Sequence, residues 1–237
     1  MRNKNRVIRN MFIGMIGIAI WIAACWLMGA YGEGNVKNGL IQSNWAKMPA
    51  LRFEISIALA SIGIPLYYYG ARDFIKAVRL SRRKKVISDH RMASLFDFGI
   101  SVGCVSFLYF HAIQCLIPVV YKMLYTTNLM SADIMNSVES VYYYTAIPMW
   151  VLYISAHAAV TISFIYLVIQ ERLNVSKICI LFNPLVFWGI SEGLKFTKIF
   201  YLVDFAAAAV PFGYLILMAC GVNHVAHIKE RRRRRTD

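Results

Sequence analysis

Charged residues are scarce in this sequence. Only 16% of its 237 residues are Asp, Glu, Lys or Arg, whereas 59% are hydrophobic. A soluble domain has about 25% charged and about 45–50% apolar residues. The composition therefore disfavours a soluble enzyme, a disordered chain and a small disulfide-stabilised domain. It predicts an integral membrane protein that crosses the bilayer several times.

Acidic residues are less than half as numerous as basic ones. The chain has 12 Asp and Glu against 26 Lys and Arg, which gives a formal net charge of +14. In a soluble protein such an excess would suggest a nucleic-acid partner. Membrane proteins, however, concentrate basic residues in their cytoplasmic loops. We therefore expect the lipid bilayer, and no nucleic acid, as the partner of these charges.

Known catalytic and cofactor motifs are lacking as well. The chain contains no H-E-x-x-H, G-x-S-x-G, P-loop or dinucleotide-binding pattern. Its five cysteines form no C-x-x-C pair, and an odd number without such pairs indicates neither a disulfide framework nor a zinc ribbon. The sequence motifs therefore indicate no particular cofactor and no particular reaction.

Long apolar runs, in contrast, are abundant. A transmembrane helix needs about 20 mostly apolar residues. Runs of this kind lie at 10–30, 53–72, 95–121, 142–170, 177–194 and 199–222. They predict an all-α bundle of six transmembrane helices that forms one membrane domain over residues 1–237. The fifth run contains Asn183-Pro184, so we expect it to span the bilayer and leave open a break at that point.

The basic residues predict the orientation of the bundle. Twenty of the 26 Lys and Arg lie at the N-terminus, in the second and fourth connections and in the basic tail 223–237. By the positive-inside rule both termini are cytoplasmic, in a multi-pass protein of the plasma membrane. The run Arg231–Arg235 is expected to attract anionic lipids, at ~1 kcal/mol per basic residue near the surface.

Two groups of side chains predict depth and packing. Tyr67, Tyr68 and Tyr69 are expected at the cytoplasmic interface, because amphipathic rings favour that depth. Ala206 to Ala209, with Gly213, give the sixth run a smooth face. A face of small residues predicts the close approach of another helix.

Polar residues inside the runs are the candidate functional residues. A charge at the centre of the bilayer costs at least ~2.5–3.5 kcal/mol, so such residues usually face the interior of the bundle. The candidates are Glu54, Asp97, His111, His157, Asn183 and Asp204. Their positions predict a polar path, with Glu54 and Asp204 toward the outside and Asp97 and Asn183 toward the cytoplasm. Glu192 and Lys195, three residues apart at a helix end, are expected to form an interfacial ion pair instead.

The two histidines are the centre of this hypothesis. His111 shares a helix face with Asp97, and His157 shares one with Tyr153 and Thr161. Both lie near mid-membrane depth, so they are expected to share one polar site, which could pass protons because the unperturbed pKa of histidine is about 6.5. The alternative is that each ring is hydrogen-bonded separately in the core. His111 and His157 are weak candidates for metal ligands, and no metal site is predicted.

Three short motifs carry a resemblance to a known family. They are Trp45-Ala46-Lys47-Met48-Pro49 leading to Arg52, then Phe110-His111-Ala112, and Phe182-Asn183-Pro184-Leu185. With them, the chain resembles an uncharacterised family of bacterial six-helix integral membrane proteins. The resemblance implies a bacterial membrane protein and no particular activity. It draws attention to His111 and Asn183.

Three functions remain open at this point. The leading hypothesis is binding or movement of a small molecule or ion, with possible proton linkage, through a polar cavity inside the bundle. One alternative is an intramembrane enzyme, metal-dependent or not, that acts on a lipid-like substrate. The other is a non-catalytic partner subunit or sensor. A water path would favour transport, a bound metal would favour an enzyme, and a dry core would favour the partner role.

Overall fold

The protein consists almost entirely of helices. The computed structural model describes residues 4–29, 37–38, 41–81, 86–127, 130–197 and 199–233. The α-helices are α1 (Lys4–Gly29), α2 (Ala50–Ser81), α3 (Ile87–Tyr125), α4 (Ser131–Ile169), α5 (Pro184–Phe196), α6 (Phe200–Ala206) and α7 (Ala209–Arg233). Two 3-10 helices, η1 (Ser43–Ala46) and η2 (Lys177–Leu181), and an antiparallel pair, β1 (Lys37–Asn38) and β2 (Ile41–Gln42), complete the described part.

Five of these helices, α1, α2, α3, α4 and α7, are long and apolar enough to cross a membrane. The predicted fold class, an all-α membrane protein with several spans, is thereby confirmed. Helix α5 has 13 residues, which is about 20 Å at a rise of 1.5 Å per residue. It is shorter than the ~30 Å hydrocarbon layer, so the sixth crossing stays a prediction.

The fifth and sixth apolar runs are each divided. The run expected over 177–194 is not one helix, because η2 ends at Leu181 and α5 begins at Pro184. Proline has no backbone N–H and fits the first turn of a helix far better than its interior. The run expected over 199–222 is divided between α6 and α7 by a turn at Ala207 and Ala208.

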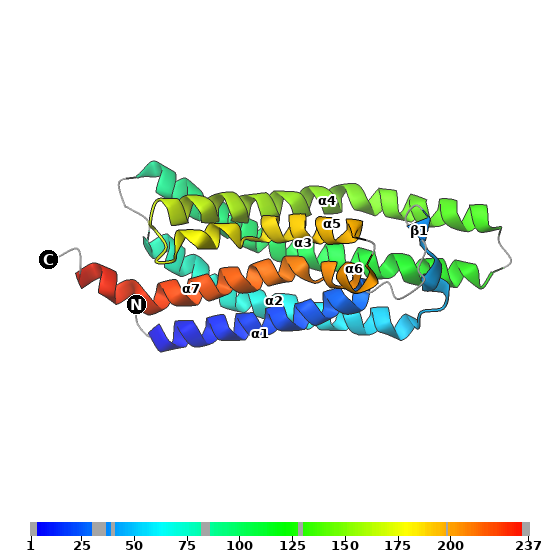
Figure 1. Cartoon of the computed structure of the whole chain (residues 1–237), viewed down its shortest axis with the longest axis horizontal. Helices are drawn as coiled ribbons and strands as arrows, with labels where there is room; N and C mark the ends of the chain where they lie inside the picture. The colour runs from blue at the N-terminus through cyan, green and yellow to red at the C-terminus, as the bar shows by residue number, and fades with distance from the viewer. Residues whose placement is uncertain are drawn as a thin grey trace.

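The helices run side by side along one long axis (Figure 1). Helix α1 packs mainly against α2, α3 against α4, and α5 against α7. The start of α1 and the end of α7 lie at the same end of the bundle, and the β1–β2 pair lies toward the other end. This arrangement agrees with an even number of passes, and it does not show which end is cytoplasmic.

Small residues bring the helices into close contact at two places. A Cβ atom on Gly17 of α1 would lie 2.5 Å from the Tyr67 nitrogen and 2.6 Å from the Gly63 oxygen of α2. In the sixth run, Ala206, Ala208 and Ala209 are buried. A Cβ atom on Gly213 of α7 would lie 2.8 Å from Pro184 Cα. The predicted close approach to the Ala206–Ala209 and Gly213 face is confirmed, and it is the packing expected of small residues in membrane helices.

Candidate functional site

Six ring-bearing side chains meet in the middle of the bundle, and we call them the aromatic box. They are Trp21 of α1, Tyr67 of α2, Phe107 of α3, Tyr153 and His157 of α4, and Tyr214 of α7. Phe107 contacts four of the other rings, with centroid distances between 4.9 and 5.7 Å. Mostly edge-to-face contacts of this kind stabilise aromatic clusters beyond their buried area. Because five helices contribute, the aromatic box fixes their relative positions.

His157 uses only one of its two ring nitrogens for hydrogen bonding in the described part of the protein. Its Nδ1 lies 2.9 Å from the Tyr153 carbonyl oxygen, and a carbonyl can only accept, so Nδ1–H is the donor. The Nε2 atom is buried and has no hydrogen-bond partner among the described residues. The hydroxyl groups of Tyr67 and Tyr214 are also buried and without such a partner there.

Tyr67 is enclosed by the bundle, and the interface depth expected for it stays a prediction. Its side chain is fully buried. The apolar run that predicted its depth ends near residue 72, whereas α2 continues to Ser81. The continuation moves Tyr67 from the end of the helix toward its middle.

His111 lies in a separate polar cluster formed by α1, α2 and α3. Its Nε2 is 2.7 Å from Ser56 Oγ, and its Nδ1 is 3.9 Å from Cys25 Sγ. Ser56 Oγ donates to the Ala24 carbonyl at 2.8 Å, and Cys115 Sγ donates to Ser56 Oγ at 3.5 Å. We call His111, Ser56, Cys25 and Cys115 the His111 cluster. Among the described residues, no hydrogen bond or ring contact joins His111 to His157.

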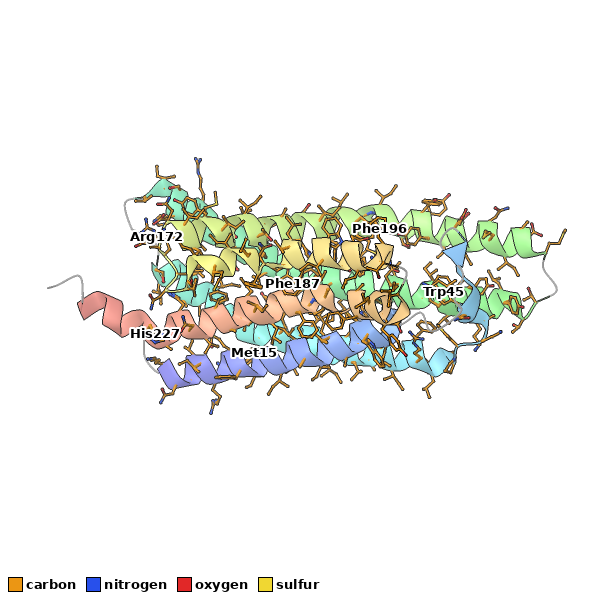
Figure 2. The ribbon with its side chains drawn as sticks, in the orientation of Figure 1. Met15, Trp45, Arg172, Phe187, Phe196 and His227 are labelled. Carbon is orange, nitrogen blue, oxygen red and sulfur yellow. The ribbon has the colours of Figure 1, made fainter. Side chains whose placement is uncertain are left out.

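A cavity of about 250 Å³ lies beside the aromatic box. Its rings come from α3, α4, α5 and η1, and its charged groups come from α5. The rings are Trp45, Phe110, Tyr142, Trp150, Tyr153 and Trp188, and the charged groups are Glu192 and Lys195. Figure 2 shows Trp45 toward the end of the bundle opposite Arg172 and His227. The cavity therefore occupies the half of the bundle that is distant from the chain ends.

Tyr153 connects the aromatic box with the cavity. Tyr153 lines the cavity, and its ring centroid lies 4.2 Å from that of His157. Trp150 donates from Nε1 to the Tyr142 hydroxyl at 3.1 Å, which orients both rings. Glu192 and Lys195 form an ion pair of 2.7 Å, as expected, and both side chains remain partly exposed. Among its described lining residues the cavity thus has one carboxylate and one ammonium group.

The other predicted residues lie elsewhere in the bundle. Asp97 pairs with Arg79 of α2 and accepts a hydrogen bond from Ser101 Oγ at 3.3 Å. Glu54 is exposed on α2. Asp204 of α6 is half-buried and interacts electrostatically with Arg52. The structure does not bring these acids together with the histidines.

Asn183 is buried and occupies the N-cap of α5. Its Oδ1 accepts hydrogen bonds from the backbone N–H groups of Leu185 and Val186, at 3.0 and 3.1 Å. Thr161 Oγ1 of α4 donates to the same oxygen at 3.2 Å. The Nδ2 group donates to the Ile180 carbonyl at 2.7 Å. With these bonds Asn183 fixes the break between η2 and α5.

Two further observations concern metal and lipid ligands. Among the described residues, no group of three or more His, Cys, Asp and Glu side chains is placed to hold a metal ion. The predicted contact of Arg231–Arg235 with anionic lipids falls on side chains outside the described part.

Sequence reasoning missed Tyr67 and Tyr214 as site residues, and also a buried ion pair. Arg172 Nε lies 2.7 Å from Asp89 Oδ2, and both side chains are almost fully buried. Tyr166 donates to Asp89 Oδ1 at 3.1 Å. Both charged residues border apolar runs, so the sequence alone placed them in cytoplasmic connections. A buried ion pair between connections depends on tertiary contacts that no local pattern reveals.

The comparisons with known proteins give a family and no function. No curated protein and no solved structure matches the chain. One family model, described as a family of unknown function (DUF6796), matches residues 1–227. That match covers nearly the whole chain and confirms the resemblance to an uncharacterised family, while a bacterial origin and a six-helix fold stay predictions. The chain therefore belongs to the family of unknown function DUF6796.

Proposed function

We propose that this protein is a plasma-membrane carrier that binds a small zwitterionic molecule in the cavity and moves it across the bilayer. The observation that carries the proposal is the charge content of the cavity. Among the described lining residues the charged ones are Glu192 and Lys195, and they neutralise each other across 2.7 Å. The plasma membrane, with both chain ends cytoplasmic, is part of the proposal and rests on the distribution of basic residues.

The ion pair favours a ligand with both charges. A cation that bound Glu192 would leave Lys195 without its partner, and an anion that bound Lys195 would leave Glu192 without its own. Either loss removes the attraction between two partly exposed charges. A zwitterion replaces both partners at once, because its acid group meets Lys195 and its cationic group meets Glu192.

The rings of the cavity suit the cationic half of such a ligand. Three tryptophans, Trp45, Trp150 and Trp188, line it, and tryptophan is the aromatic residue that attracts cations most strongly. The volume of about 250 Å³ is below the ~300–1,000 Å³ of sites for drug-sized ligands. The proposal therefore concerns a small metabolite and not a lipid.

The divided helices beside the cavity favour movement over binding alone. Trp188, Glu192 and Lys195 come from α5, which begins at the break after Asn183, and Ala207 lies at the turn between α6 and α7 and also lines the cavity. Substrate sites of secondary transporters are typically formed by discontinuous helices. Two broken segments at one cavity support the same interpretation here.

Thermal unfolding of the purified full-length protein tests the ligand class. The probes are glycine betaine and two isosteres that each keep one charge, 3,3-dimethylbutanoate and choline. A ligand that binds only the folded state raises the unfolding midpoint. We expect low-millimolar glycine betaine to raise it more than either isostere does, and to lose this effect in Glu192→Gln. The matched control is Glu54→Gln, which changes an exposed carboxylate outside the cavity.

Two results of this experiment would contradict the proposed ligand class. Equal responses to the three probes would show that the cavity does not distinguish a zwitterion. A glycine betaine response that is the same in Glu192→Gln and in the wild type would place binding elsewhere. Either result would contradict the proposed ligand class.

A further inference from the structure

The aromatic box contains a buried hydrogen-bond acceptor that has no partner in the described part of the protein. Because Nδ1 of His157 donates to the Tyr153 carbonyl, the neutral ring has its lone pair on Nε2. This atom is buried in a side chain that is 1% exposed and has no hydrogen-bond partner among the described residues. A polar group buried in an apolar interior destabilises the folded state when it has no partner.

Two hydroxyl groups with the same deficiency lie in contacting rings. The ring centroids of His157 and Tyr214 are 5.6 Å apart and perpendicular, and those of Tyr214 and Tyr67 are 5.5 Å apart. Both phenol side chains are fully buried, and neither hydroxyl has a partner in the described part of the chain. Buried polar groups without a partner are few in native proteins. Three of them therefore lie in one series of contacting rings, from Tyr67 through Tyr214 to His157.

We propose that a small neutral molecule with an O–H or N–H donor binds in the aromatic box and bridges His157, Tyr67 and Tyr214. It donates to the Nε2 lone pair, and it exchanges hydrogen bonds with the phenol groups, which both donate and accept. Neutrality follows from the surroundings, since the box carries no formal charge when His157 is neutral. Water and a small polar solute share this chemistry.

This binding site is distinct from the cavity, and it does not rest on the proposed zwitterion. Tyr153 separates the two, with its ring in the lining of the cavity and against His157. The substitutions that test the aromatic box therefore leave Glu192 and Lys195 unchanged. A result that contradicts the ligand of the aromatic box therefore does not contradict the zwitterion in the cavity, and the reverse also holds.

A double-substitution cycle tests the shared partner. Tyr67→Phe and Tyr214→Phe each remove one hydroxyl and keep the ring, so the packing of the box is preserved. We expect each to lower the unfolding midpoint of the full-length protein. The double variant should lose less than the sum, because the first substitution already weakens the bridging molecule. Tyr144→Phe, at an 87% exposed position, is the matched control and should change nothing.

Two results of the cycle would overturn the proposal. An unchanged or raised midpoint in either single variant would show that the hydroxyl was unsatisfied in a dry core, because its removal would then relieve the cost of burial. Strictly additive losses would show two independent partners.

Nitrogen NMR of histidine-labelled protein provides a second readout. The Nε2 signal of His157, assigned with His157→Gln, should show a hydrogen-bonded lone pair, and it should respond alike to Tyr67→Phe and Tyr214→Phe. A response confined to one of them would indicate a direct phenol–imidazole bond and overturn the bridge. Exhaustive dialysis distinguishes the two sources of the ligand: a bonded signal that persists identifies water, and one that disappears identifies an exchangeable solute.

Discussion

His111 and His157 differ at the level of single atoms, although both are buried and both lie on helix faces that point inward. Ser56 donates its only hydroxyl proton to the Ala24 carbonyl at 2.8 Å, so its oxygen accepts the proton of His111 Nε2 across 2.7 Å. The proton that His111 shares with Ser56 is thus on Nε2, whereas the proton that His157 donates to the Tyr153 carbonyl is on Nδ1. Both nitrogens of the first ring have partners, and Nε2 of the second has none among the described residues.

The His111 cluster makes a prediction about stability. Ser56→Ala removes the acceptor of His111 Nε2–H and the donor to Ala24, and it leaves a buried N–H unpaired. We expect the free energy of unfolding to fall by about 1–3 kcal/mol, which is the cost of an unsatisfied buried donor. Denaturant or thermal unfolding of the full-length protein measures it.

Ser106→Ala is the matched control for this substitution. Ser106 is also fully buried, but among the described residues its hydroxyl donates to the Gly103 carbonyl of its own helix, at 2.9 Å, and to no other group. We expect a smaller loss there. An equal loss in the two variants would mean that the bond to His111 adds nothing to stability.

At the scale of elements, the break between η2 and α5 shows what a sequence pattern can indicate. Asn183-Pro184 marked the position, and the apolar length of 177–194 favoured a continuous span. What decides the outcome is the Asn183 cap, which includes a hydrogen bond from Thr161, 22 residues earlier on α4. Local spacing contains no information on that partner.

The second stability prediction concerns the Asn183 cap of α5. Asn183→Ala leaves the N–H groups of Leu185 and Val186 without their acceptor, and the loss of an N-cap typically costs ~0.5–2 kcal/mol. We expect a loss at the upper end of this range, since Thr161 also loses its acceptor. Thermal unfolding measures it, and Ser176→Ala, at the exposed cap of η2, should stay within about 0.5 kcal/mol of the wild type. Indistinguishable effects of the two substitutions would contradict the role of Asn183.

Helix ends and tertiary contacts limited the sequence prediction for the whole molecule. Hydropathy identified an all-α membrane protein because apolar runs of this length are typical of transmembrane helices and rare in soluble domains. It underestimated α3 and α4, which have 39 residues each and a length of about 58 Å, because a helix can continue in water with polar residues that hydropathy does not count.

The candidate site was foreseen only in part. The spacing of Tyr153, His157 and Thr161 predicted an inward face, and all three are buried. Tyr214 and most of the cavity residues could not be found in this way, because they come from segments far apart in the sequence that meet only in the folded bundle. Counting residues along each apolar run places His111 and His157 at a similar depth, but it does not predict which side chains surround each of them.

The central claim is that the cavity holds a small zwitterionic molecule, and mass spectrometry of what the purified protein retains tests it most directly. Small molecules are extracted from the wild type, from Glu192→Gln and Trp150→Leu in the cavity, and from Trp26→Leu, whose tryptophan is 51% exposed on α1 and does not line the cavity. We expect one zwitterionic species to be enriched with the wild type and Trp26→Leu and depleted from both cavity variants. Identical extracts from all four proteins would contradict the claim.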